Sequence, residues 1–142
     1  MTILDLFKLE GKKAVVTGGG GGIGRGIALG LAEAGCDVAL AGRRPGPIEA
    51  TAQEIEERGR KALALPTDVR DNSQVEALVK SVIDEFGQID IWVNNAGGLQ
   101  EQKVNFLVKT TEESWDTTTS LNLKSPWMCA KAVWPFRTSA PF

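Results

Sequence analysis

Histidine and tyrosine are both absent from the 142 residues of this chain, and cysteine occurs only twice. Histidine is the commonest metal ligand and the side chain that most often titrates near neutral pH, so its absence removes the usual basis for metal binding. Cys36 and Cys129 lie far apart in the sequence and form neither a metal-ligand nor a redox spacing. We therefore predict no metal site and, because two isolated cysteines are typical of a reducing compartment, a cytoplasmic location.

A strong net charge and long apolar runs are also missing. The formal net charge is −2 at pH 7, which gives no electrostatic footprint for binding nucleic acid or an anionic membrane. No apolar run approaches the roughly 18 residues of a membrane-spanning helix, and the first residues lack the basic and apolar regions of a signal peptide. With 42% hydrophobic and 24% charged residues, the sequence predicts a single globular domain over residues 1–142.

Glycine, in contrast, is concentrated between a predicted strand and a predicted helix. Residues 14–17 form a short apolar run, residues 18–22 are all glycine, and a helical pattern continues to about residue 34. Glycine allows a sharp turn and a close approach of the main chain to a diphosphate, which the N-terminus of the helix also attracts. This context predicts a dinucleotide-binding loop. The candidate cofactor contacts are Gly18, Gly21, Gly22, Ile23 and Gly24.

The register of this glycine motif stays open at the level of sequence. Gly19-x-Gly21-x-x-Gly24 fits the general dehydrogenase fingerprint, whereas Gly18-x-x-x-Gly22-x-Gly24 fits the form found in short-chain dehydrogenases. The alternative to both is a flexible glycine loop without a ligand.

The second predicted strand, residues 37–42, ends at two arginines. In dinucleotide-binding folds an acidic residue at this point binds the ribose 2′-hydroxyl of NAD, whereas an arginine accommodates the 2′-phosphate of NADP. Gly42 occupies the acidic position, and Arg43 and Arg44 follow it. Because a guanidinium matches phosphate bidentately, we predict NADP as the preferred cofactor, with NAD possible. The alternative is that both arginines are solvated loop charges.

Two further predicted strands, residues 62–65 and 89–93, also end in small or polar residues. Asp68 could accept a hydrogen bond from the adenine amino group while the backbone of Val69 covers the ring edge, although an isolated Asp at this point is typical of a turn. The last predicted strand is followed by Asn95, Ala96 and Gly97. Because ligands of open α/β sheets bind at the carboxyl ends of the strands, we expect all these residues to meet in one site.

These motifs, in this order, resemble those of the short-chain dehydrogenase/reductase family. The resemblance covers nearly the whole chain and rests on residues 17–24, 68–69, 94–97 and 120–123. It implies an α/β fold of Rossmann type with three layers (αβα), in which helices cover both faces of a parallel sheet with strand order 3-2-1-4. It also implies an NAD(P)-dependent oxidoreductase that transfers hydride between the cofactor and an alcohol or carbonyl compound.

The resemblance further implies individual roles. It places Asn95 in the wall on the adenosine side of the cofactor, and it matches Asn122 to the family's catalytic Asn-Ser-Tyr-Lys group, where Asn holds a water in the proton relay. The family's Ser and Tyr-x-x-x-Lys would follow the helix of Asn122, and the chain ends at Phe142 without them. We therefore expect a truncated form that is inactive alone. The alternatives are a non-catalytic NADP-binding module and half of a split enzyme.

The end of the chain departs from the family pattern. Residues 136–142 lose it, and we interpret this as a premature stop or a frameshift near Phe136. An incomplete sheet would leave Ile89, Ile91 and Val93 on an exposed apolar edge, and it would uncover Trp127 and Trp134 on the last helix. We therefore predict self-association or a homo-oligomer. The substrate stays open among steroids, sugars, acyl thioesters and simple ketones, because the family builds its substrate pocket largely after the catalytic tyrosine.

Helix boundaries can be predicted from capping residues. A helix with apolar residues at helical spacing over residues 75–86 is preceded by Asp71 and Gln74, a capping pair, and is followed by Gly87. Thr110 and Glu113 suggest a capping box for the last helix, which we expect Pro126 to interrupt because proline lacks the N–H of a helical hydrogen bond.

Overall fold

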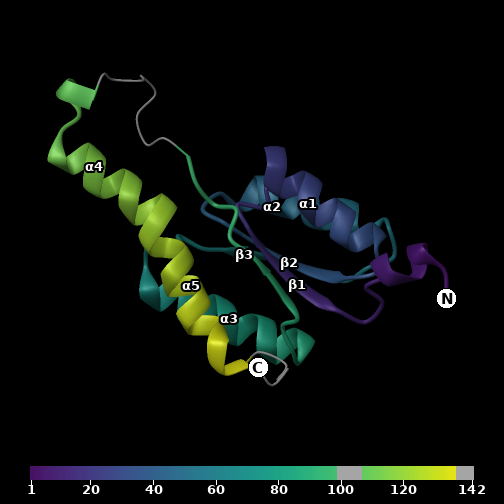
Figure 1. Ribbon diagram of the computed structural model, residues 1–142. Helices are drawn as coiled ribbons and strands as arrows, with labels where there is room; N and C mark the ends of the chain where they lie inside the picture. Colours follow the sequence, from purple (N-terminus) through teal and green to yellow (C-terminus); the bar gives the residue numbers. More distant parts are fainter. Residues whose placement is uncertain (99–106, 137–142) are drawn as a thin grey trace.

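The computed structural model describes residues 1–98 and 107–136, and its centre is a parallel four-stranded sheet (Figure 1). The strands lie in the order β3-β2-β1-β4, which confirms the predicted order. Their bounds are β1 Lys13–Thr17, β2 Asp37–Gly42, β3 Ala62–Pro66 and β4 Ile91–Val93. Residues 137–142, to which the frameshift interpretation applies, lie outside the described residues.

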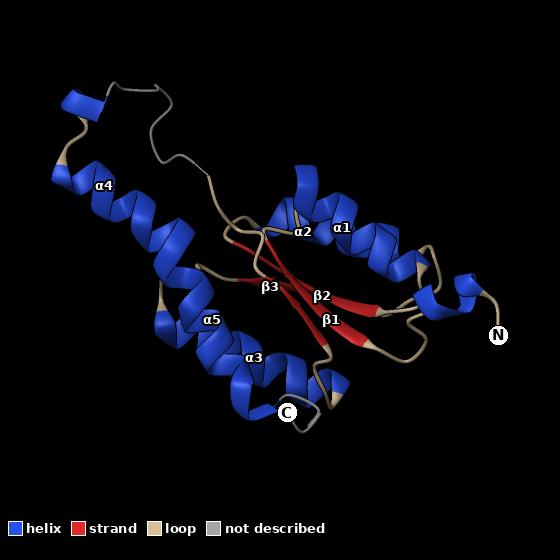
Figure 2. Cartoon of the chain, in the orientation of Figure 1, coloured by secondary structure: helices blue, strands red, loops and turns tan. Residues whose placement is uncertain are grey.

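Helices cover both faces of this sheet, which confirms the three-layer αβα architecture (Figure 2). One face carries α1 (Gly22–Glu33) and α2 (Pro45–Glu56), and the other carries α3 (Asn72–Phe86) and α5 (Ser125–Val133). The remaining elements are α4 (Glu112–Thr119), a π-helical turn η3 (Ser120–Lys124), and the 3-10 turns η1 (Ile3–Phe7), η2 (Leu107–Lys109) and η4 (Trp134–Phe136). Within residues 1–98 and 107–136, no helix is long and apolar enough to cross a membrane.

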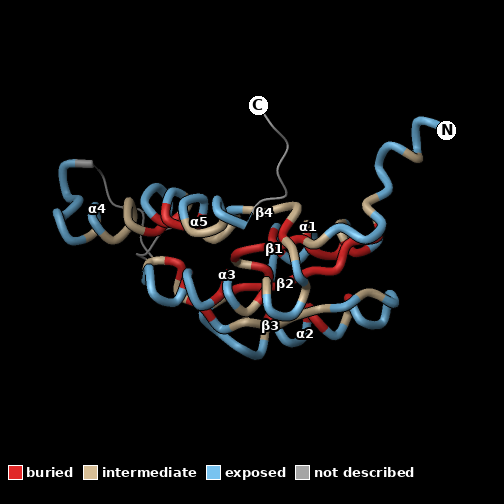
Figure 3. The backbone as a smooth tube through the Cα atoms, turned by 90° about the horizontal axis from the view of Figure 1, so that it is seen from below, coloured by how far each residue is buried: buried red, intermediate tan, exposed pale blue. Residues whose placement is uncertain are grey.

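The two central strands, β1 and β2, form the core because they are covered on both faces (Figure 3). Successive side chains of a strand point to opposite faces of the sheet. Val16 and Leu40 therefore pack against α1 and α2, whereas Val15 and Ala39 pack against α3 and α5. Strands buried on both faces consist of continuous apolar residues, which is why residues 14–16 and 38–41 contain no polar side chain.

The predicted boundaries of α3 are confirmed. Asp71 is its N-cap and accepts hydrogen bonds from the backbone N–H groups of Ser73 and Gln74, and Gly87 ends it with a left-handed φ of 80°. The predicted cap of the last helix is wrong by one residue. The N-cap is Thr111, whose hydroxyl accepts from the N–H of Ser114, so the helix begins one position later than Thr110 suggested. The expected irregularity before Pro126 is present as the π-helical turn η3.

The prediction of an exposed apolar edge at residues 89–93 is only partly correct. β4 is a three-residue edge strand that pairs with β1, so its outer backbone has no partner among the described strands. Its side chains are nevertheless covered, since Ile89 is buried and Ile91 and Val93 are half-buried. The reason is that these residues point to the faces of the sheet, where the flanking helices lie, rather than outward along its edge.

The buried carboxylate of Asp37 holds together the amino ends of β1, β2 and β3, opposite the site described below. Asp37 accepts hydrogen bonds from the Lys13 ammonium at 2.5 Å and the backbone N–H of Lys61 at 3.0 Å, and it forms an ion pair with the guanidinium of Arg60 at 2.8 Å. Burial by itself would raise the pKa of Asp37, but these hydrogen bonds and positive charges outweigh it and hold the pKa below its usual value. The folded state therefore favours the charged form of this group.

We expect acid to weaken the fold through this carboxylate. Because the pKa of Asp37 is lower in the folded state, its stabilising contribution is present above the unfolded-state pKa of about 3.9 and is lost as the pH falls below it. D37N should therefore unfold more easily than the parent chain at pH 7, and the difference should shrink below about pH 4. Urea unfolding at several pH values tests this. D84N, on an exposed i,i+4 pair of α3, is the matched control; an unfolding difference for D37N that does not change with pH would contradict the assignment.

Candidate nucleotide-binding cleft

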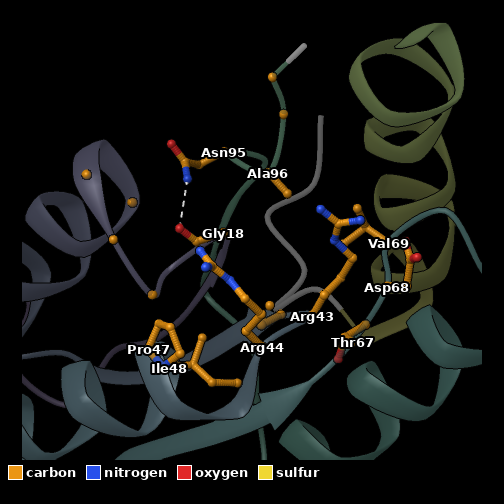
Figure 4. A pocket seen from close by; sticks show the side chains of 18 of the residues that line it. Gly18, Arg43, Arg44, Pro47, Ile48, Thr67, Asp68, Val69, Asn95 and Ala96 are labelled. Carbon is orange, nitrogen blue, oxygen red and sulfur yellow. Dashed lines mark hydrogen bonds between the residues drawn. The ribbon is translucent and has the colours of Figure 1, made fainter. Parts of the chain in front are cut away.

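A cleft of about 720 Å³ opens at the carboxyl ends of the strands (Figure 4). The loops that follow all four strands contribute to its walls, as expected for an open α/β sheet. All twelve predicted cofactor contacts line it, and eight further residues complete it: Gly20, Ala41, Gly42, Pro47, Ile48, Thr67, Gly98 and Leu121. The structure therefore brings the predicted set together in one place, with Asn122 the one candidate outside the lining.

The positions of the glycine run differ in backbone conformation and in the space available for a side chain. These differences favour the register Gly18-x-x-x-Gly22-x-Gly24. Gly18 and Gly22 have left-handed φ values of 67° and 51°, a conformation that is costly for other residues. A Cβ atom on Gly24 would lie 2.1 Å from the carbonyl oxygen of Gly18, so the first turn of α1 can approach the loop only without a side chain. Gly21, which belongs to the alternative register, has open space around it.

The N-terminus of α1 faces the cleft without a capping side chain. Gly21 is the N-cap, with extended backbone and no side-chain hydrogen bond to the helix. The N–H groups of the first helical turn have no carbonyl partner within a helix, and they carry its positive dipole end. Gly22, Ile23 and Gly24 supply these groups and all line the cleft. The arrangement is suited to binding an anionic group such as a diphosphate.

Arg43 and Arg44 bring positive charge to the same cleft from the end of β2 (Figure 4). Both are exposed, and neither forms an ion pair with any residue in the described ranges 1–98 and 107–136. The other arginines of these ranges, at positions 25, 58, 60 and 70, are each paired with a carboxylate. Two guanidinium groups are thus available to a ligand in the cleft.

Asp68 and Val69 form the wall that follows β3. The Asp68 carboxylate is held by Arg70, whose Nη2 donates to Oδ2 at 2.6 Å and whose Nε donates to both oxygens. The hydrogen bond from Arg70 is the largest cause that lowers the pKa of Asp68 below its usual value, and the positive charge of Arg43 adds to it. Asp68 is therefore a charged acceptor at the cleft wall. Val69 is buried beneath it.

Asn95 and Thr17 lock the glycine loop to the end of β4. The Asn95 amide Nδ2 donates to the carbonyl oxygens of Thr17 at 2.9 Å and Gly18 at 3.2 Å. In the opposite direction, the buried hydroxyl of Thr17 accepts from the backbone N–H groups of Asn95 and Ala96, both at 3.0 Å, and donates to Val93 O. These bonds join the loop 95–97 to the loop that begins at Gly18, so two walls of the cleft are held in a fixed relation to each other.

Asn122 lies at the π-helical turn η3, beside the last described residue of the loop after β4. Its side-chain Oδ1 accepts from the N–H of Gly98, and its Nδ2 donates to the carbonyl oxygens of Gly98 and Thr118, at 2.8 to 2.9 Å. The side chain thus joins the helix to the mouth of the cleft. It stands next to the cleft rather than among the residues that line it.

Sequence reasoning missed Thr17 as a structural centre, and it missed Pro47 and Ile48 as part of the wall. A Cβ atom on Gly20 would lie 2.8 Å from Pro47 Cβ and 3.1 Å from Ile48 N, so the glycine loop rests directly on the start of α2. A signal for Thr17 was present, because it is the one polar residue of the predicted strand 14–17 and immediately precedes the glycine run. No local signal identifies Pro47, since its contact is made across the fold.

A parallel sheet in this order, with a glycine turn at the first helix and a cleft across the strand ends, defines a dinucleotide-binding domain of Rossmann type. The family model described as short chain dehydrogenase matches residues 12–140. The chain therefore belongs to the short chain dehydrogenase family, and the resemblance inferred from its motifs is confirmed.

Three similar proteins place the chain within this family. The 2-dehydro-3-deoxy-D-gluconate 5-dehydrogenase of Dickeya dadantii (strain 3937) is 39% identical over 131 residues, which are 92% of this chain and 50% of the relative. A short chain dehydrogenase from Burkholderia cenocepacia J2315 in complex with NADP has a TM-score of 0.85 at 35% identity, over 92% of this chain and 52% of that one. A 7α-hydroxysteroid dehydrogenase complexed with NADH and 7-oxo glycochenodeoxycholic acid has a TM-score of 0.87 at 30% identity, over 96% and 52%. The chain thus spans about half the length of the curated relatives it matches.

Proposed function

We propose that this chain is the nicotinamide-dinucleotide-binding part of an oxidoreductase that interconverts an alcohol and a carbonyl compound. One observation carries the proposal: a single cleft contains an uncapped helix N-terminus, a glycine loop that a Cβ atom would obstruct, and two guanidinium groups without an ion pair among the described residues. Each of these features suits a phosphate-bearing ligand. Membership of the short chain dehydrogenase family supports the same function.

The residues of the cleft fit the parts of such a cofactor. The N–H groups of Gly22, Ile23 and Gly24 would hold the diphosphate, Asp68 and Val69 the adenine, and Asn95 with Ala96 and Gly97 the wall beside the ribose. When bound, the nicotinamide supplies a hydride donor or acceptor for the carbonyl or alcohol carbon. Asn122 would hold the proton-relay water that its match to the family implies. The amide of Asn122 already fixes the backbone of Gly98, so the same side chain would order the mouth of the cleft.

Proton transfer is the step for which the residues that line the cleft offer neither a tyrosine nor a histidine. The sequence contains no tyrosine and no histidine, and Asn122 itself does not titrate. We propose that the chain binds the cofactor without turning over substrate alone. A partner chain or an additional segment that supplies a Ser and Tyr-x-x-x-Lys would complete the site.

NADP is the cofactor that we propose the cleft prefers. The two structural neighbours carry different cofactors, one NADP and the other NADH, so the preference rests on this chain's own residues. Arg43 and Arg44 follow β2 at the point where the 2′-position of the ribose is recognised in this type of fold. No carboxylate occupies that point, because the residue before the arginines is Gly42.

We expect R43A/R44A to weaken NADP binding much more than NAD binding. Each charge-assisted hydrogen bond to a phosphate contributes about 1.5–3 kcal/mol, so losing both should lower NADP affinity by at least about 100-fold and NAD affinity by less than about threefold. Calorimetric titration of the 142-residue chain with each cofactor measures both. R58Q, which removes a guanidinium paired with Glu33 away from the cleft, is the control for loss of positive charge. Equal losses of affinity for NADP and NAD would contradict the assignment of these two arginines to the 2′-phosphate.

We also propose that the chain associates with itself and that it is cytoplasmic. Self-association is supported by the helical arm α4–η3–α5, on which Trp115, Trp127 and Leu123 are more than half exposed. The proposal of a reducing compartment is supported by Cys36 and Cys129, which are both buried and free.

A further inference from the structure

Asp68 is the carboxylate of the cleft wall, and its partner Arg70 lies outside the cleft. Arg70 binds both carboxylate oxygens through its side chain, and its backbone N–H adds a fourth bond, to Oδ1 at 3.0 Å. Arg70 is not among the residues that line the cleft, whereas Asp68 is. The guanidinium that holds the carboxylate therefore belongs to a residue that does not itself line the cleft.

Arg43 stands near the same carboxylate without pairing with it. Both residues line the cleft, and the view in Figure 4 shows the Arg43 side chain rising towards the loop of Asp68 and Val69. The charge of Arg43 is close enough to contribute to the lowered pKa of Asp68, yet no ion pair joins the two side chains. A carboxylate and a 2′-phosphate bind the same donors of a guanidinium, so Asp68 is a potential competitor for Arg43.

The backbone around Asp68 is held by hydrogen bonds and packing, so the position of the carboxylate depends on the conformation of the Asp68 side chain. The N–H of Asp68 donates to the Gln74 amide oxygen at 2.8 Å, and the next residue, Val69, is anchored in the core. The N-cap Asp71 is tied to α3 on the other side. Loss of the Arg70 side chain would thus leave the loop in place and remove three of the four hydrogen bonds to the carboxylate, so that it can turn about the bond that the backbone N–H of residue 70 retains.

We propose that Arg70 is a positioning residue that maintains NADP preference by keeping the Asp68 carboxylate away from Arg43. The role rests on the proposed function, since it concerns the same cleft and cofactor. It differs from that of Arg43 and Arg44, because Arg70 acts on the ligand only through Asp68. Its effect is selective: a carboxylate paired with Arg43 opposes the 2′-phosphate of NADP, but it takes nothing from NAD at that position.

The preference ratio Kd(NAD)/Kd(NADP) is the quantity that tests this role. R70Q is expected to lower the ratio about fivefold, which corresponds to the roughly 1 kcal/mol of a partly exposed ion pair between Asp68 and Arg43. R70K, which keeps the charge but not the two-atom contact, should give an intermediate ratio. A general disturbance of the Asp68 loop would instead weaken NAD and NADP equally and leave the ratio unchanged.

A double-mutant cycle separates this role from a long-range effect of the Arg70 charge. In a D68N background no carboxylate can capture Arg43, so adding R70Q should leave the ratio at the D68N value. R58Q serves as the control that loses an equally charged, paired arginine on another part of the surface. An unchanged ratio in R70Q, or the same fall with and without D68N, would overturn the inference. If the parent chain binds neither cofactor saturably, the proposed function fails instead, so the two failures are distinguishable.

Discussion

G24A is expected to abolish saturable NADP binding and to cost the fold about 3 kcal/mol of unfolding free energy, at the upper end for an overpacked site. The added Cβ would lie 2.1 Å from the Gly18 carbonyl oxygen and 2.4 Å from Asn95 Nδ2. Neither neighbour is the far end of a flexible side chain, since the first is backbone and the second is held by two hydrogen bonds. The first turn of α1 must therefore move away from the loop, and its N–H groups move with it.

Calorimetric titration with NADP and urea unfolding of the same samples measure both effects of G24A. The matched control is G26A, two residues further along α1, where a Cβ atom would meet nothing within 4 Å. Because alanine is the better helix former, G26A should gain about 0.5–1 kcal/mol in stability and should bind NADP as the parent does. Parent-like binding by G24A would show that the close approach of α1 to the loop is not needed for the ligand.

The same glycines show what the sequence can and cannot predict. The strand, the glycine run and the helix were readable because each has a local pattern, and the strand order followed from the family resemblance. The residues predicted to meet at the strand ends do line one cleft. The register within the run was not readable, because five identical residues carry no information on which of them turns left-handed. Only the fold separates Gly18, which turns with φ 67°, from Gly19, which lies against Leu40.

Interactions between distant segments account for most of what sequence reasoning did not reach. The predicted edge strand 89–93 was expected to expose Ile89, but α3 and α5 cover that face of the sheet, and a pattern within a strand cannot show how far a helix extends. Asp68 and Arg70 are only two residues apart in the sequence and form a local ion pair. The role that we propose for this pair nevertheless depends on Arg43, which follows β2 and lines the same cleft as Asp68. Thr17 is similar, since its partners are more than 70 residues away.

T17V is the second change for which we expect a large effect. Valine has the shape of threonine, but it cannot accept the N–H of Ala96, and it leaves the N–H of Asn95 with the carbonyl of Val93 as its only acceptor. An unsatisfied buried donor costs about 1–3 kcal/mol, and Thr17 is almost completely buried. We expect a loss of about 2 kcal/mol in unfolding free energy. Because the wall 95–97 would then separate from the glycine loop, NADP and NAD should both bind about tenfold more weakly.

The relative effects on NAD and NADP binding distinguish the role of the Thr17 hydroxyl from that of the two arginines at the end of β2. T17V acts on the wall that NAD and NADP share, so the ratio Kd(NAD)/Kd(NADP) should stay at the parent value, whereas R43A/R44A should lower it. T17S is the matched control: it keeps the hydroxyl, loses one buried methyl group at a cost of about 1 kcal/mol, and should retain parent affinity for both cofactors. Equal binding by T17S and T17V would mean that the hydroxyl does not position the wall. The cleft would then owe its geometry to packing alone, with the Asn95 amide as its remaining polar link to the glycine loop.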